Sequence, residues 1–152
     1  ADNALITDKS LTPFVSRLVE EPIASTLKRL SLARCLRAGA ATHQATLNLL
    51  PAAYNLQQLS LAKVQISARL QLPICQAIGQ HDVLKDVNLA EIGLGNTLAT
   101  SQCLTALLGS KSVENLDLSW NVLVGNAFDH LGELMRENKV LKKLRLPPPP
   151  AA

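Results

Sequence analysis

Aliphatic residues recur along this chain in one short pattern, in which the first, fourth and sixth of six residues are apolar and the others polar. Leu56-Gln-Gln-Leu59-Ser-Leu61 shows it clearly. Alternation around the fourth and sixth residues is typical of a short strand with one buried face. The pattern therefore predicts five strands, and their first apolar residues are Leu27, Leu56, Leu84, Val113 and Leu141.

These starting positions are evenly spaced, because they follow one another by 29, 28, 29 and 28 residues. A fixed period of 20 to 50 residues indicates a repeat protein, in which each unit is too small to bury its own apolar face. Neighbouring units then stack and share one core. We expect Leu30, Leu59, Val87, Leu116 and Leu144 to form a single buried row.

Between the strands, apolar residues fall three and four positions apart, which predicts one helix in each unit. The expected helices span about residues 42–50, 70–79, 101–108 and 126–138. Another helix precedes the first strand, with Ser10 as its cap and Pro22 as its end. Pro51 is expected to end the helix at 42–50.

The most complete unit is Val113-Glu-Asn-Leu-Asp-Leu-Ser-Trp-Asn-Val-Leu123. It resembles the leucine-rich-repeat motif L-x-x-L-x-L-x-x-N/C-x-L. The alternation of 28 and 29 residues resembles the ribonuclease-inhibitor-like class of this family. The resemblance implies an α/β fold, a right-handed solenoid curved into an arc, with parallel strands on the concave face and α-helices on the convex face.

The ninth position of the motif departs from the family in two units. It is normally Asn or Cys, and here it is Cys35, Val64, Ile92 and Asn121 in turn. Because a polar side chain at this position satisfies backbone groups, we expect irregular corners at Val64 and Ile92.

The repeat pattern divides the chain into three segments. Residues 1–26 are expected to be the helical tail of a preceding repeat, residues 27–146 the repeat array, and residues 147–152 a proline-rich stub or linker. The last strand offers its apolar face to nothing that follows it. We therefore expect neighbouring repeats or subunits at both ends, and a chain that is a fragment of a longer array.

Composition narrows the class of protein further. The chain is 47% hydrophobic but only 3% aromatic, with 30 Leu in 152 residues, so the core must be aliphatic. A net charge of +3 and few stacking aromatics argue against a nucleic-acid partner. No apolar run is long enough for a membrane span, and no signal segment is visible. Three cysteines without framework spacing favour a cytoplasmic, reducing location.

The candidate chemistry is sparse. Cys75 and Cys103 lie 28 residues apart on neighbouring helices, whose expected separation of about 8–10 Å favours buried packing over a disulfide. His43, His81 and His130 fall in different units without a recurring carboxylate or cysteine. We therefore predict no catalytic site, no metal site and no cofactor.

The exposed third, fifth and eighth positions of each unit form the candidate partner-binding surface. Their charge changes from basic to acidic and back to basic with Lys143 and Arg145. Trp120 is the only tryptophan, and it is either an interface hot spot or a cover for the strand edge. The candidate contact residues are Arg29, Arg34, Lys63, Asp86, Asn88, Glu91, Asn115, Asp117 and Trp120.

These features favour a non-catalytic scaffold that binds a protein partner on its concave face. The family resemblance also implies two alternatives. One is a regulatory accessory such as a GTPase-activating module, and the other is an architectural component of a large cytoskeletal or ciliary assembly. Fold alone does not choose among them.

Overall fold

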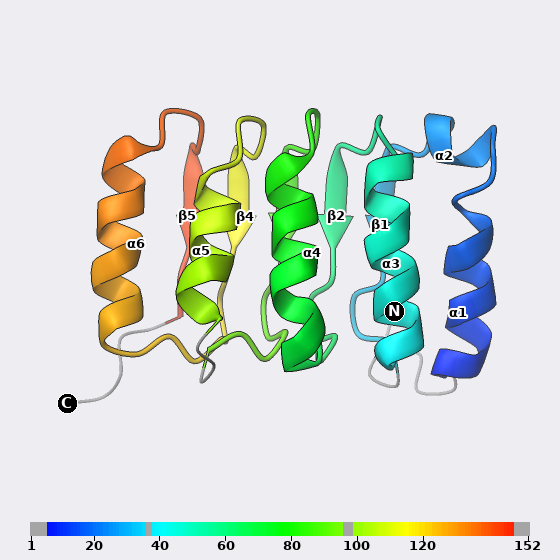
Figure 1. Cartoon of the computed structure of the whole chain (residues 1–152), viewed down its shortest axis with the longest axis horizontal. Coiled ribbons are helices and arrows are strands. Elements are labelled where there is room, and N and C mark those ends of the chain that lie inside the picture. Colours follow the sequence, from blue (N-terminus) through cyan, green and yellow to red (C-terminus); the bar gives the residue numbers. More distant parts are fainter. Residues whose placement is uncertain (1–5, 36–37, 96–98, 148–152) are drawn as a thin grey trace.

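The computed structural model describes residues 6–35, 38–95 and 99–147. In this part of the chain, five short strands form one parallel sheet, and they follow one another in chain order (Figure 1). The strands are β1 (Arg29–Ser31), β2 (Gln58–Ser60), β3 (Asp86–Asn88), β4 (Asn115–Asp117) and β5 (Lys143–Arg145). The remainder of the predicted proline-rich segment, after Pro147, lies outside the described residues.

The register of the sheet aligns equivalent positions of all five predicted units. Leu30 pairs with Leu59, Leu59 with Val87, Val87 with Leu116, and Leu116 with Leu144. The first four of these side chains are at most 8% exposed, whereas Leu144 is half-buried. The predicted row of aligned apolar residues is thus confirmed, and its last member, Leu144, is more exposed to solvent than the other four.

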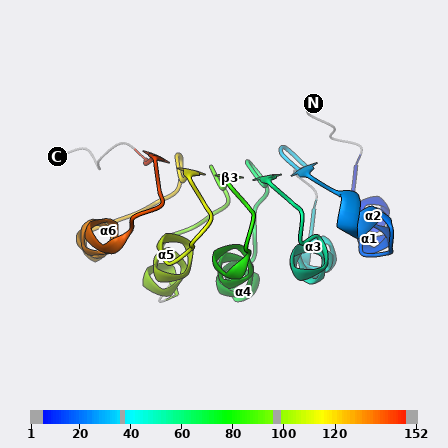
Figure 2. The same ribbon diagram turned by 90° about the horizontal axis from the view of Figure 1, so that it is seen from above.

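Helices cover one face of the sheet and leave the other open. Figure 2 shows the helices along the outer side of a shallow arc and the strands along its inner side. Each strand alternates a core-facing residue with residues on the open face, which is why the motif has polar third and fifth positions. The helices are α1 (Asp8–Arg17), α2 (Ile23–Thr26), α3 (Ala40–Ala52), α4 (Ala68–Gln80), α5 (Thr100–Leu108) and α6 (Asn126–Glu137).

The four predicted inter-strand helices are confirmed to within two residues at every end. Pro51 does not end its helix, because α3 runs to Ala52. The amide of Ala53 donates to the Leu49 carbonyl oxygen at 2.8 Å, which carries the helical hydrogen bonding past the proline.

The cap and end predicted for the first helix are wrong. Thr7 is the N-cap of α1, and Ser10 is the third residue inside the helix, where it completes a capping box with Thr7. The helix ends at Arg17, well before Pro22. Its buried residues Leu11 and Val15 pack in the same apolar core as α3.

The corners after the strands are regular, in contrast to the expectation for Val64 and Ile92. Arg34, Lys63, Glu91 and Trp120 all adopt left-handed backbone angles, with φ between 54° and 63°. The amides of Arg34, Lys63 and Glu91 each donate to the backbone of the next unit at 2.8 to 2.9 Å. Backbone bonding therefore maintains the corners where the ninth side chain is apolar.

A single apolar cluster runs through the units, and its fully buried members are almost all Leu, Ile and Val. Coverage weakens beyond β4, where Met135 on α6 is 45% exposed. None of the helices in the described ranges has the length and apolar character needed to cross a bilayer.

Candidate partner-binding face of the sheet

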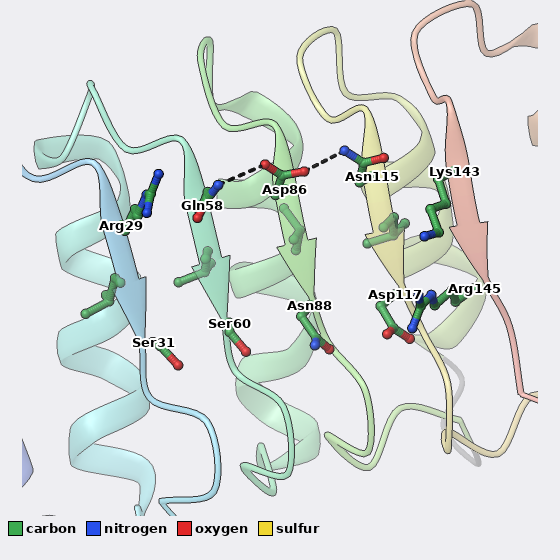
Figure 3. Close-up of a pocket in the computed structure, with 14 residues that line it drawn as sticks. Arg29, Ser31, Gln58, Ser60, Asp86, Asn88, Asn115, Asp117, Lys143 and Arg145 are labelled. Atoms are coloured by element: carbon green, nitrogen blue, oxygen red, sulfur yellow. Dashed lines mark hydrogen bonds between the residues drawn. The ribbon is translucent and has the colours of Figure 1, made fainter. Parts of the chain in front are cut away.

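The open face of the sheet is hollowed into a depression of about 800 Å³, which all five strands line. We call this depression the sheet-face hollow. Its polar lining comes from two rows, which are the third and fifth residues of each unit (Figure 3). The upper row contains Arg29, Gln58, Asp86, Asn115 and Lys143, and the lower row contains Ser31, Ser60, Asn88, Asp117 and Arg145.

Asp86 lies at the centre of the upper row, between two side-chain amides. Gln58 Nε2 donates to Asp86 Oδ2 at 3.3 Å, and Asn115 Nδ2 donates to Asp86 Oδ1 at 2.5 Å. These bonds join three neighbouring strands, as Figure 3 shows by its dashed lines. Each carboxylate oxygen accepts one bond, so the group is held in a defined orientation on the half-buried strand β3.

Two side chains of the lower row accept hydrogen bonds from backbone amides just after their own strands end. Asn88 Oδ1 accepts from the amide of Ala90 at 3.0 Å, and Asp117 Oδ1 accepts from the amide of Ser119 at 2.9 Å. Both side chains are thereby fixed at the point where the chain turns into the corner.

Charge is distributed unevenly across the hollow. Arg29 lies at one side and Lys143 and Arg145 lie at the other, all exposed. Asp86 on the central strand β3 and Asp117 on β4, in register with Arg145, are half-buried. Among the described residues, Lys142 forms an ion pair with Glu114, and His130 lies 4.0 Å from Glu133; neither contact involves a charge of the hollow. The two carboxylates therefore have no cation of the described chain paired with them.

The structure divides the nine predicted contact residues into two groups. Arg29, Asp86, Asn88, Asn115 and Asp117 line the hollow together. The other four, which are Arg34, Lys63, Glu91 and Trp120, occupy the left-handed corner positions and do not line it.

The link between Gln58 and Asp86 was not predicted. The available signal was that both are third residues of adjacent units, 28 positions apart. Side chains at the same position of paired parallel strands are neighbours, so the period identifies the pair, although it does not determine the hydrogen bond between them.

Trp120 stands in the corner after β4 with 72% of its surface exposed. The next residue, Asn121, is 5% exposed and holds the corner together. Its Oδ1 accepts from the amides of Ile92 and Leu94 at 3.1 and 3.0 Å, and its Nδ2 donates to Leu89 and Leu118 carbonyl oxygens at 2.8 and 3.0 Å. This pattern explains why the motif favours Asn at its ninth position.

The histidines have separate environments. His81 Nε2 lies 2.8 Å from the Ala53 carbonyl oxygen, and its Nδ1 accepts from the amides of Val83 and Leu84 at 3.2 and 3.1 Å. His130 Nε2 lies 2.8 Å from Thr105 Oγ1.

His43 is 4% exposed, neither ring nitrogen has a hydrogen-bond partner, and burial lowers its pKa. In the described ranges, no three His, Cys, Asp or Glu side chains gather as a metal site would require.

The cysteines pack where helices α4 and α5 meet. Cys75 and Cys103 are both free and at most 1% exposed. A hydrogen bond between the two thiols, together with burial, raises the pKa of Cys75 well above its ordinary value. A buried thiol with a raised pKa, such as that of Cys75, is a poor nucleophile.

No protein-family model and no curated protein matches this chain. The sheet-face hollow offers oriented carboxylates, amides, hydroxyls and cations over five strands, which is chemistry suited to recognising another molecule by hydrogen bonds and charge.

Proposed function

We propose that this chain is a leucine-rich-repeat protein of the ribonuclease-inhibitor-like class, and that it is a non-catalytic scaffold for a protein partner. Three features support the class. The units repeat every 28 or 29 residues, each combines one strand with one helix, and Asn121 bonds the corner of the best-matching unit from the ninth position.

The observation that carries the proposed function is the continuity of the sheet-face hollow. Polar third and fifth residues from all five strands line it, while the fourth residues of the same strands face the core. Polar groups are thus arranged over the full width of the array without interruption by a helix or loop. A broad, rigid and chemically varied surface suits recognition of a macromolecule better than chemistry on a small substrate.

The corner residues extend this surface at its border. Trp120 is the largest exposed side chain there, and tryptophan is enriched among residues that dominate binding energy. In the proposed complex, the hollow contacts the partner by polar groups and Trp120 adds an apolar contact at the border.

Site-specific photo-crosslinking tests the proposed function. A photoreactive benzoylphenylalanine at Ser31, exposed in the hollow, is expected to form a covalent adduct with a discrete partner protein in cell lysate. The same group at Ser101, exposed on helix α5, is the matched control and is expected to form none. Asp86→Lys in the Ser31 background should abolish the adduct.

Equal adducts from both positions, no adduct from Ser31, or an adduct that persists with Asp86→Lys would contradict the proposed binding face.

The proposal also includes further units or subunits at the ends of the array. Within the described residues, β5 pairs only with β4, and Leu144 is half-buried where its aligned counterparts are buried. At the opposite end, α1 already covers α3. The edge formed by β5 and α6 is therefore the stronger candidate for such a contact.

A further inference from the structure

The sheet-face hollow has a charge pattern that specifies its ligand more closely than a general protein-binding role does. Cations stand at both sides and the Asp86 carboxylate stands in the middle. A complementary ligand must have the reverse order, with one cation between two anions. This inference rests on the proposed function and names the kind of partner segment involved.

Asp86, at the centre of the upper row, is oriented to bind a cation from a partner. The two amides that bond Asp86 keep its oxygens oriented, and both donors are neutral, so they leave its negative charge uncompensated. Asp117 lies on the adjacent strand β4 and is also half-buried and without a cation among the described residues. A half-buried, oriented carboxylate binds a partner's ammonium or guanidinium group more strongly than an exposed one.

The distance between the charges sets the spacing required of the ligand. Adjacent strands lie about 4.8 Å apart, so β1 and β5 each lie about 9.6 Å from β3. In a polyproline II segment, every third residue points in the same direction, and three residues span about 9.3 Å. In a β-extended peptide, the same-facing residues i and i+2 span only about 6.8 Å.

The polar lining also distinguishes a polyproline II segment from a helix. Seven residues of an α-helix span about 10.5 Å, which would also fit the charges. However, helices dock by an apolar stripe. The aliphatic residues that line the hollow are at most 8% exposed, and its more exposed side chains are amides, hydroxyls and charges. A polyproline II backbone has no internal hydrogen bonds, so its carbonyl and amide groups can use Asn88, Ser60 and similar groups.

We propose that the sheet-face hollow binds a partner segment in polyproline II conformation that crosses the strands and carries an acidic, a basic and an acidic residue at positions i, i+3 and i+6. The basic residue faces Asp86 on the central strand β3. The acidic residues face Arg29 at one side and Lys143 and Arg145 at the other.

Fluorescence anisotropy with the full chain and labelled synthetic peptides tests this proposal. The probe is Glu-Pro-Ser-Lys-Pro-Ser-Glu with blocked ends. The first comparison is the charge-inverted peptide Lys-Pro-Ser-Glu-Pro-Ser-Lys, and the second is a pair of peptides whose charges are spaced by two or by seven residues. We expect the three-residue spacing to bind at least about tenfold more tightly than each comparison, and to weaken as salt is added.

Two protein variants locate the binding. Asp86→Asn removes the charge while keeping the shape, and it should weaken binding of the probe about tenfold. Asp82→Asn makes the same chemical change in the exposed turn after α4, away from the hollow, and should leave binding unchanged. Circular dichroism of both variants checks that the fold is retained.

Equal binding of the charge-inverted peptide, tighter binding of the seven-residue spacing, no binding of the probe, or equal effects of Asp86→Asn and Asp82→Asn would each overturn the proposal. Failure of this proposal can be distinguished from failure of the proposed function. Crosslinking from Ser31 that depends on Asp86, without binding of the probe peptide, would retain the protein-binding face and reject only this ligand.

Discussion

At the scale of single residues, the contact between α1 and α3 depends on a carboxylate that reaches from one helix to the start of another. Asp8 Oδ1 accepts from the amides of Gly39 and Thr42 at 3.0 and 2.9 Å, and also from the hydroxyls of Thr42 and Thr12. The bond from the Thr42 hydroxyl is the largest cause of a lowered pKa at Asp8, and burial opposes it. Asp8 therefore caps α3 from outside that helix.

His43 lies in the first full turn of α3. Its pKa is lowered in the folded chain, as is that of Asp8. Its ring is buried without a hydrogen-bond partner, so burial favours the neutral form and lowers its pKa, while the charge of Asp8 partly opposes this. Unlike an exposed histidine, it resists protonation while the chain is folded. Protonation at low pH thus favours the unfolded chain.

These two groups predict a loss of stability in two acidic ranges. A lowered pKa means that the unfolded chain binds the proton more readily, so stability is complete above the unfolded pKa and is lost below it. The loss should begin below about pH 6.5 for His43 and below about pH 4 for Asp8. The free energy of unfolding in urea, measured from pH 8 to pH 3, checks both ranges.

Variants assign the two ranges to their residues. His43→Gln should flatten the decline between about pH 6.5 and pH 5, and Asp8→Asn should flatten the decline below about pH 4. If wild type and both variants had parallel pH profiles, neither group would contribute in the manner described.

At the scale of elements, helices α4 and α5 approach one another more closely than a normal side chain would permit. A Cβ atom added to Gly79 would lie 2.1 Å from the carbonyl oxygen of Ala106 on α5. Cys75, one turn earlier on α4, is in contact with Cys103 across the same interface. Small residues therefore line the closest part of this helix pair.

Gly79→Ala should consequently destabilise the protein, because backbone on the neighbouring helix would have to move. Overpacking of this kind costs about 1–3 kcal/mol. Gly132→Ala is the matched control, since that glycine is also within a helix and a Cβ atom there meets nothing within 4 Å. The control should be stabilising by up to about 1 kcal/mol through helix propensity.

Thermal or urea unfolding of both variants measures the difference. Equal effects of the two substitutions would show that α4 and α5 are not in the close contact described.

Among the elements, the strand register could be predicted from the sequence, whereas the geometry of the corners could not. The strand register followed from the period, because a constant step of 28 or 29 residues aligns Leu59 with Val87 and Leu116 whatever the details of the turns. The corners were misjudged because backbone bonds from Lys63 and Glu91 sustain them without a polar ninth residue. Side-chain amides also assist, since Gln71 Nε2 donates to Ile66 and Gly93 carbonyl oxygens, each at 3.0 Å.

The candidate site was predictable in part for the same reason. Residues at the third and fifth positions necessarily share the open face, so Asp86, Asn115 and Asp117 were found from alternation. The eighth position was assigned to the same surface, yet its left-handed backbone places Trp120 in the corner. Hydrogen bonds such as those from Gln58 and Asn115 depend on rotamers, which the period does not determine.

At the scale of the whole molecule, the proposed end-to-end contacts predict concentration-dependent association. The β5–α6 edge exposes apolar groups, including Leu144 and Met135, that a further unit would cover. Sedimentation velocity of the wild-type chain at increasing concentration should show growing species, and Leu144→Glu with Met135→Glu should shift them toward the monomer. A wild-type chain that remained monomeric over the whole range would contradict the proposal.

The sheet-face hollow exists only if the five strands are in register, so that equivalent positions of successive units lie side by side. Methyl-labelled nuclear magnetic resonance measures this arrangement most directly. The account predicts nuclear Overhauser contacts from Leu59 to both Leu30 and Val87, and from Leu116 to both Val87 and Leu144. Absence of the contacts between these aligned neighbours would contradict the stacked array and the binding face built on it.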